Sequence, residues 1–205
     1  MDKKEYIKKV LRLFFIYWLC TAFGVYIGQF LPSYLLLPAS ILGLVLLLIT
    51  VFLHKNSRLS KVTYYFIALL LGISAFATLQ HFITSLGTAK LFSIVLMVVI
   101  IFGMLGLFGY KINLDLRKFG TYLFILLLVL IALTLVALLI PGNSVLMLAL
   151  SGFGLFLFSL YTIYDFNRIA NNSNDKNDIH HDAFSLYINL FNMIINALNI
   201  ANFLD

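Results

Sequence analysis

The sequence predicts an all-α polytopic membrane protein, a bundle of seven transmembrane helices that forms one domain over residues 1–205. Three observations lead to this fold class: the composition, the length of the apolar runs and the placement of the basic residues. Of the 205 residues, 62% are hydrophobic and only 11% are charged, and the mean hydropathy is +1.04. Soluble domains are about half apolar and about a quarter charged. A soluble domain of this size cannot hide so much apolar surface.

Seven apolar runs of about 20 residues follow one another along the chain. Each is long enough to cross the roughly 30 Å of bilayer hydrocarbon as a helix. The runs lack the strict alternation of barrel strands. Within lipid only helices and closed barrels pair every backbone N–H and C=O, so helices are predicted. The approximate spans are 10–31, 34–53, 62–83, 91–110, 119–140, 144–165 and 183–204.

The basic residues indicate how the bundle is oriented. With the N-terminus in the cytoplasm, every one of the 14 Lys and Arg residues except Lys90 falls on the inner side. Cytoplasmic loops carry an excess of Lys and Arg, so the sequence predicts a multi-pass protein with its N-terminus in the cytoplasm and its C-terminus outside. The same charges are spread over four short loops and form no continuous basic groove, which argues against nucleic acid as a partner.

One ionisable residue stands at the edge of a span and is a candidate for function. Asp165 lies at the inner end of the sixth span, and Arg168, three residues further on, can share its helical face. Two interpretations remain open. The pair is either a structural ion pair at the membrane interface, or Asp165 is a buried carboxylate that faces a polar cavity and whose protonation changes the packing.

A stripe of polar residues runs along the seventh span. Its members recur at spacings of four, three, four and three, which places them within an arc of about 80° on a helix. They are Ser185, Asn189, Asn192, Asn196 and Asn199. Asparagine is unfavourable against lipid, so we expect the stripe to face the bundle interior, with Asn189 at a depth comparable to that of Asp165. The stripe either joins helices by hydrogen bonds or lines a path for hard cations such as Ca²⁺, which favour oxygen ligands.

The sequence contains no arrangement typical of an enzyme. HExxH and P-loop motifs are absent, and Ser151 is the only faint candidate for a nucleophile within a span. Cys20 is the single cysteine, which excludes an intrachain disulfide and a cysteine-based metal site. His180, His181 and Asp182 are interpreted as part of a polar loop over 171–182 or as interface residues. We therefore expect neither enzymatic activity nor a tightly bound cofactor.

Two segments near the C-terminus resemble the signature of the Bax inhibitor-1 family, also called the transmembrane Bax inhibitor motif family. These segments are Tyr161–Ile169 and Ala183–Asn192, and Gly28–Pro32 and Leu37–Leu42 are similar to the first two spans of bacterial members. The resemblance implies a bundle with a central seventh helix in a bacterial plasma membrane. It also implies a pH-sensitive calcium leak that a pair of aspartates latches shut on the cytoplasmic side.

The latch can be compared with this sequence residue by residue. Asp165 matches the first aspartate, but the second falls on Asn189, so two like charges no longer compete for one proton. The basic residue that supports the latch is replaced by His54, and Gly43 stands where the family has a carboxylate in the second span. The predicted gate therefore comprises Asp165, Asn189, Arg168 and His54.

Two functional hypotheses follow. In the first, the chain is a leak channel for cations, chiefly Ca²⁺, modulated by pH, with Asp165 as a Ca²⁺ contact. Its partners are the lipid bilayer, Ca²⁺ and protons, and the chain is a monomer or a weak oligomer. In the second, the chain is a non-channel regulator that binds other membrane proteins, such as a membrane protease. The asparagine stripe then only holds helices together, and Asp165 is a structural ion pair.

Overall fold

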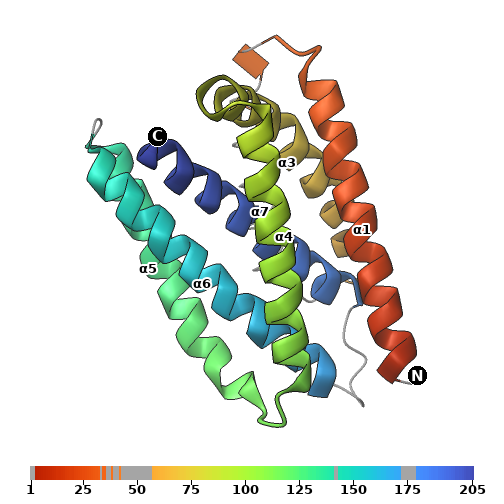
Figure 1. Cartoon of the computed structure of the whole chain (residues 1–205). Helices are drawn as coiled ribbons and strands as arrows, with labels where there is room; N and C mark the ends of the chain where they lie inside the picture. The colour runs from red at the N-terminus through yellow and green to blue at the C-terminus, as the bar shows by residue number, and fades with distance from the viewer. Residues whose placement is uncertain are drawn as a thin grey trace. The chain divides into compact units, whose positions relative to one another are not determined.

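The computed structural model describes residues 3–32, 34–35, 38, 42, 57–140, 143–171 and 179–205. Its elements are helical (Figure 1): α1 (Lys3–Gly28), α3 (Ser57–Leu86), α4 (Thr88–Lys111), the 3₁₀ helix η1 (Leu116–Phe119), α5 (Gly120–Leu138), α6 (Ser144–Asn171) and α7 (Ile179–Leu204). Six helices in the described ranges are long and apolar enough to cross a membrane. The prediction of an all-α polytopic membrane protein is confirmed. Most of the predicted second span, 34–53, lies outside the described residues, so the count of seven stays a prediction.

The described helices divide into two compact units. The first contains Met1–Thr84 and Lys176–Tyr187, which bring together α1, α3 and the beginning of α7. The second contains Ser85–Asp175 and Ile188–Asp205, which bring together α4, η1, α5, α6 and the remainder of α7. Helix α7 thus contributes residues to both units. That the whole chain forms one domain remains a prediction.

Helix α7 begins earlier than the sequence indicated. Its first residue is Ile179. Of the two placements expected for His180, His181 and Asp182, the polar loop was therefore wrong, and a position at the membrane interface stays a prediction. These residues become helical because two of them have partners on α1 within the first unit. The hydroxyl of Tyr6 donates to Asp182 Oδ2 at 2.8 Å, and Tyr17 Oη lies 3.0 Å from His180 Nδ1. An acidic side chain in a first helical turn is also favoured by the helix dipole.

Close backbone contact joins α1 and α3 in the first unit. A methyl group added at Gly24 would lie 2.2 Å from the carbonyl oxygen of Leu69, and one added at Gly72 would lie 2.1 Å from that of Thr21. Only residues without a Cβ permit such an approach, which is how small residues pack helices in membranes. Thr21 also bonds Tyr187 of α7, with 2.6 Å between the two hydroxyl oxygens.

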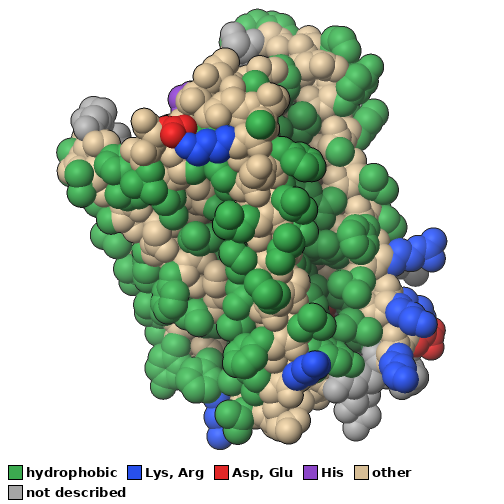
Figure 2. Space-filling view, in the orientation of Figure 1, with side chains coloured by type: hydrophobic (Ala, Val, Ile, Leu, Met, Phe, Trp, Pro, Cys, Tyr) green, Lys and Arg blue, Asp and Glu red, His purple; other side chains and the backbone are tan. Residues whose placement is uncertain are grey.

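Helix α6 packs against α4 in the second unit through close contacts at glycines of the same kind. A Cβ at Gly109 would lie 2.3 Å from the carbonyl oxygen of Ile163, and one at Gly106 would lie 2.7 Å from the ring of Phe166. The outward faces of this unit are apolar: Figure 2 shows hydrophobic side chains over the visible side of α4 and of the α5–α6 pair, with Lys and Arg near the α4–α5 connection. Large exposed side chains such as Phe92, Leu107 and Tyr122 require lipid as the surrounding solvent. The bilayer is therefore a partner of the chain.

Candidate functional site

Asp165 is the centre of the candidate site, and it lies on α6 with only 2% of its surface exposed. Each of its carboxylate oxygens has a partner in the second unit. Asn189 Nδ2 on α7 donates to Oδ2 at 2.8 Å, and Arg168 Nη2 lies 3.1 Å from Oδ1. The structure thus brings together three of the four residues of the predicted gate. A buried charge is stable only when it is paired and hydrogen-bonded in this way.

Helical spacing and an aromatic ring position Arg168 beside the carboxylate. Arg168 stands one turn after Asp165, so both side chains project from the same face of α6. The guanidinium carbon also lies 5.7 Å from the ring centroid of Tyr164, within the range of a cation–π contact. Tyr164 itself reaches α5, because a Cβ at Gly120 would lie 2.5 Å from its hydroxyl oxygen.

Asn189 lies further from the start of its helix than in the predicted span, 183–204. It is ten residues after Ile179, the first residue of α7, or about 15 Å at 1.5 Å per residue. It is 4% exposed. Another pair of the same two helices lies beside it, since Thr162 Oγ1 is 3.5 Å from Met193 Sδ. The Asp165–Asn189 hydrogen bond is therefore enclosed between α6 and α7 within the second unit.

Asn167 is a buried polar residue that the sequence interpretation missed. It is fully buried, and its amide nitrogen lies within 3.2 Å of the carbonyl oxygens of Gly109, Ile112 and Leu114. Its Oδ1 accepts from the backbone N–H of Leu116 at 2.9 Å. One side chain thus holds the connection between α4 and η1 against α6, two residues from Asp165. The signal in the sequence was an asparagine within an otherwise apolar and aromatic stretch.

The polar stripe of α7 does not face the interior along its whole length. Asn192 and Asn196 are half-buried, and their amides donate to the carbonyls of Ile188 and Asn192 in their own helix at 2.9 and 2.8 Å. Asn199 is exposed, so at its position the stripe borders open space and not packed side chains. An amide that bonds the carbonyl four residues back needs no partner on another helix. Ser185 is half-buried and belongs to the first unit.

Asn199 lines a cavity of about 450 Å³ between the beginning of α6 and the end of α7 in the second unit. Its walls carry two serines and two asparagines together with three apolar side chains: Ser144, Ser151, Asn199, Asn202, Met147, Leu148 and Phe203. Continuing the stripe by one more step of three residues reaches Asn202. Ser144 and Ser151 are seven residues apart on α6, so they share a face. Both spacings were visible in the sequence.

The remaining residues considered for the latch are His54, Gly43 and Asp182. His54 and Gly43 lie outside the described residues. Asp182 was expected in the loop or at the interface but is 1% exposed on α7 in the first unit, where it accepts the Tyr6 hydrogen bond. Within the described ranges, no three His, Cys, Asp or Glu side chains lie close enough together to hold a metal ion.

Comparison with known sequences places this chain in a family. The sequence model of the family described as inhibitor of apoptosis-promoting Bax1 matches residues 3–204. The chain belongs to this Bax inhibitor-1 family. Two Helicobacter pylori proteins, each described as an uncharacterized protein, are 30% identical over 129 residues. That alignment covers 63% of this chain and 55% of each relative, so the chain spans about half the length of the curated relatives it matches. The chain is thus a Bax inhibitor-1 membrane protein.

Proposed function

We propose that this Bax inhibitor-1 protein is a leak pathway for cations, chiefly Ca²⁺, with Asp165 as its gate. The observation that carries the proposal is a carboxylate with 2% of its surface exposed, held by an amide and a guanidinium between two membrane-length helices. Ionisable residues at such positions commonly mark ion pathways. Carboxylate and amide oxygens are also the ligands that Ca²⁺ takes in proteins.

In the proposed closed state, Asn189 and Arg168 occupy the oxygens of Asp165 that an ion would otherwise contact. Opening separates α6 from α7 at this contact and frees the carboxylate. The pathway belongs to a bundle of seven spans in which α7 is central, with the N-terminus in the cytoplasm and the C-terminus outside. The placement of the basic residues supports this orientation, and the Helicobacter relatives support a bacterial plasma membrane.

Calcium flux into proteoliposomes tests the gate. Asp165→Ala removes both contacts of the latch, so we expect Ca²⁺ influx at neutral pH to rise several-fold over the unmodified protein. Asp115→Ala is a matched control, because Asp115 also pairs with an arginine, Arg117, but is exposed and lies in a connection. Unmodified protein that passes no more Ca²⁺ than empty vesicles at acidic and neutral pH would overturn the proposal.

The asparagine at position 189 leads to a second prediction, concerning pH. Asn189 donates to Asp165 but carries no charge of its own, so the pair has no second carboxylate with which to share a proton. Asn189→Asp restores two like charges at hydrogen-bonding distance, and we expect the flux to depend more steeply on pH. Flux would be measured between pH 5 and 8 in matched vesicles. A pH profile identical to that of the unmodified protein would argue against a latch at this contact.

A non-channel regulator is the second candidate function, and one observation favours it. Both oxygens of Asp165 already have partners, so the site is stable without a bound cation and can act as a purely structural ion pair. The chain would then bind another membrane protein, such as a membrane protease. Purification in mild detergent separates the two functions: a stoichiometric partner together with vesicle flux at background level supports the regulator.

A further inference from the structure

The cavity between the beginning of α6 and the end of α7 contains polar groups that neither the gate nor the packing uses. Within the described part of the chain, none of the side chains of Ser144, Ser151, Asn199 and Asn202 makes a hydrogen bond. Other polar residues on these helices behave differently. Ser159 and Thr162 donate to carbonyls one turn back on α6, and Asn196 does the same on α7.

Exposure to the surroundings of the protein does not explain why these side chains make no hydrogen bonds, as Ser151 shows. It is only 7% exposed, yet it lines the cavity. Its hydroxyl oxygen is not among the fully buried polar atoms that lack a partner in the described residues, so it borders the open space of the cavity. Ordered water supplies a hydrogen-bonding partner where such a site is polar and large enough. At about 30 Å³ for each liquid water, the cavity has room for on the order of ten water molecules. That is enough to keep a small ion hydrated.

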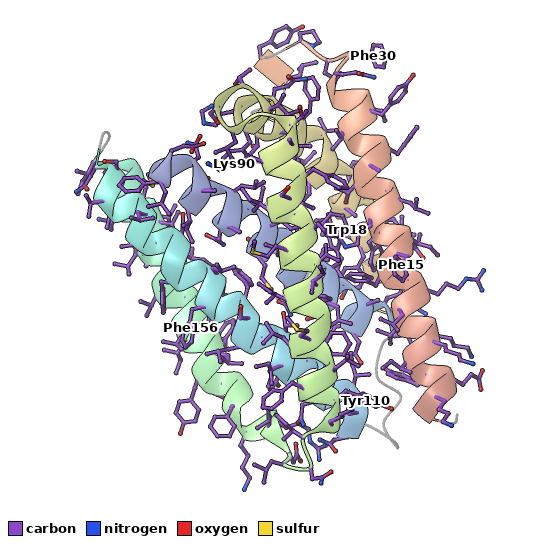
Figure 3. All side chains as sticks on the ribbon, in the orientation of Figure 1. Phe15, Trp18, Phe30, Lys90, Tyr110 and Phe156 are labelled. Atoms are coloured by element: carbon purple, nitrogen blue, oxygen red, sulfur yellow. The ribbon has the colours of Figure 1, made fainter. Side chains whose placement is uncertain are left out.

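The walls of the cavity are electrically neutral. Its seven lining residues include no Asp, Glu, Lys, Arg or His. At this end of the second unit, Lys90 on α4 (labelled in Figure 3) and Asp205 after α7 form an ion pair with each other. Clefts enrich ions of one sign when their walls carry net charge. This cavity therefore does not sort solutes by charge.

We propose that this cavity is a water-filled vestibule that admits small hydrated solutes of either charge, with Ser151 as a buried polar contact. In the proposed cation path the cavity is the second mouth, and to that extent the inference rests on the proposed function. It adds that selection for cations occurs not here but at Asp165, which is 14 residues along α6 from Ser151, or about 21 Å at 1.5 Å per residue. The hydrated cavity itself does not require conduction.

Cysteine accessibility in vesicles tests the vestibule. Cys20→Ser first removes the single native thiol, and single cysteines are then placed by Ser151→Cys and Asn202→Cys. Two matched variants on α6 serve as controls: Leu157→Cys at a fully buried site, and Phe156→Cys at a site 60% exposed but without a place in the cavity wall (Figure 3). Membrane-impermeant methanethiosulfonates, one cationic and one anionic, are supplied on both sides of the bilayer.

Thiols react as thiolates, which form in water and are suppressed in apolar surroundings, so we expect both vestibule cysteines to react at least about tenfold faster than both controls. The cationic and anionic reagents should react at similar rates. If Ser151→Cys reacts no faster than Leu157→Cys, the cavity is dry and the proposal is overturned. A cationic reagent that reacts at least about tenfold faster than the anionic one would overturn the neutrality of the vestibule.

The labelling distinguishes this inference from the proposed function. Rapid labelling of Ser151→Cys in protein that passes no Ca²⁺ would leave the vestibule in place and remove the channel. Calcium flux through protein in which Ser151→Cys stays unlabelled would remove the vestibule and leave the channel in place. Ser151→Ala keeps the small side chain and guards against misfolding as an explanation: it should elute as the unmodified protein does in size-exclusion chromatography and should leave labelling of Asn202→Cys unchanged.

Discussion

Polar side chains at the two ends of α6 differ in their hydrogen bonding. Around Asp165, the carboxylate oxygens have partners on α6 and α7, and Asn167 uses both ends of its amide. Around Ser151, the polar side chains that line the cavity make no hydrogen bonds within the described residues. The difference teaches that a charge inside a membrane protein needs fixed partners, whereas neutral hydroxyls and amides can face water.

Packing depends on which face of α6 a residue occupies. Near Asp165, the α4–α6 contact is so close that a methyl group at Gly109 would strike the backbone of Ile163. Near Ser151, a methyl group at the buried Gly154 would lie 2.8 Å from the side-chain oxygen of Asn196 on α7, whereas one at the exposed Gly152 would meet nothing within 4 Å. Close packing and open space therefore lie side by side at the Ser151 end.

The largest expected effect concerns the charge at the packed end. Asp165→Asn keeps the size of the side chain but leaves the Arg168 guanidinium, 17% exposed in its side chain, without its counter-charge. We expect a loss of about 3 kcal/mol in the free energy of unfolding, typical of a buried pair that loses one partner. Unfolding by SDS in mixed micelles measures it. A loss below about 1 kcal/mol would place this pair with exposed ion pairs and weaken the contrast.

Next in size is the difference in packing. Gly109→Ala should destabilise the protein by about 1–3 kcal/mol, because the backbone of α6 must move to accept the methyl group. Gly152→Ala is the matched control at an exposed position, and it should be neutral or stabilise by up to about 1 kcal/mol, since alanine favours helix over glycine. Thermal unfolding in detergent, followed by circular dichroism, compares the two. Equal shifts of both midpoints would contradict the difference in packing.

The smallest effect lies outside the membrane-spanning helices. Asp115 caps η1 and pairs with Arg117, whose hydrogen bonds lower the pKa of the Asp115 carboxyl from its usual 3.8 to about 2. A lowered folded-state pKa stabilises the protein at neutral pH, and that contribution disappears as the pH falls from about 4 toward 2. We expect Asp115→Asn to lower the unfolding midpoint slightly at pH 7.

Acid removes the difference between this variant and the unmodified protein. At pH 2 the carboxyl is about half protonated in the folded protein and almost fully protonated in the unfolded chain, so most of the difference between the two midpoints should disappear. A gap between the two midpoints that is unchanged from pH 7 to pH 2 would show that the ion pair is not its cause. Because Asp115 is exposed, this result also provides the surface reference for the buried pair at Asp165.

Regular patterns in the sequence predicted what depends on neighbours along the chain. Apolar runs predicted the helices, and a spacing of three predicted that Arg168 lies beside Asp165. Contacts between distant segments were beyond these patterns. The burial of Asp182 depends on Tyr6, which is 176 residues away. The role of Asn167 depends on carbonyls of the α4–η1 connection, whose path no periodicity specifies. A stripe on one face also does not show whether its last members, such as Asn199, meet packed side chains or the wall of a cavity.

The hydrogen bonds of Asn167 have a consequence for anyone who engineers this protein. The α4–η1 connection is short and lies between helices, which would make it an attractive place to insert a reporter domain or an epitope. Yet a single buried amide contacts two carbonyls of this connection, those of Ile112 and Leu114, and also the carbonyl of Gly109 in α4 and the N–H of Leu116 in η1. An insertion between residues 112 and 116 would pull these groups from Asn167, two residues from Asp165, so this connection is a poor site for a fusion.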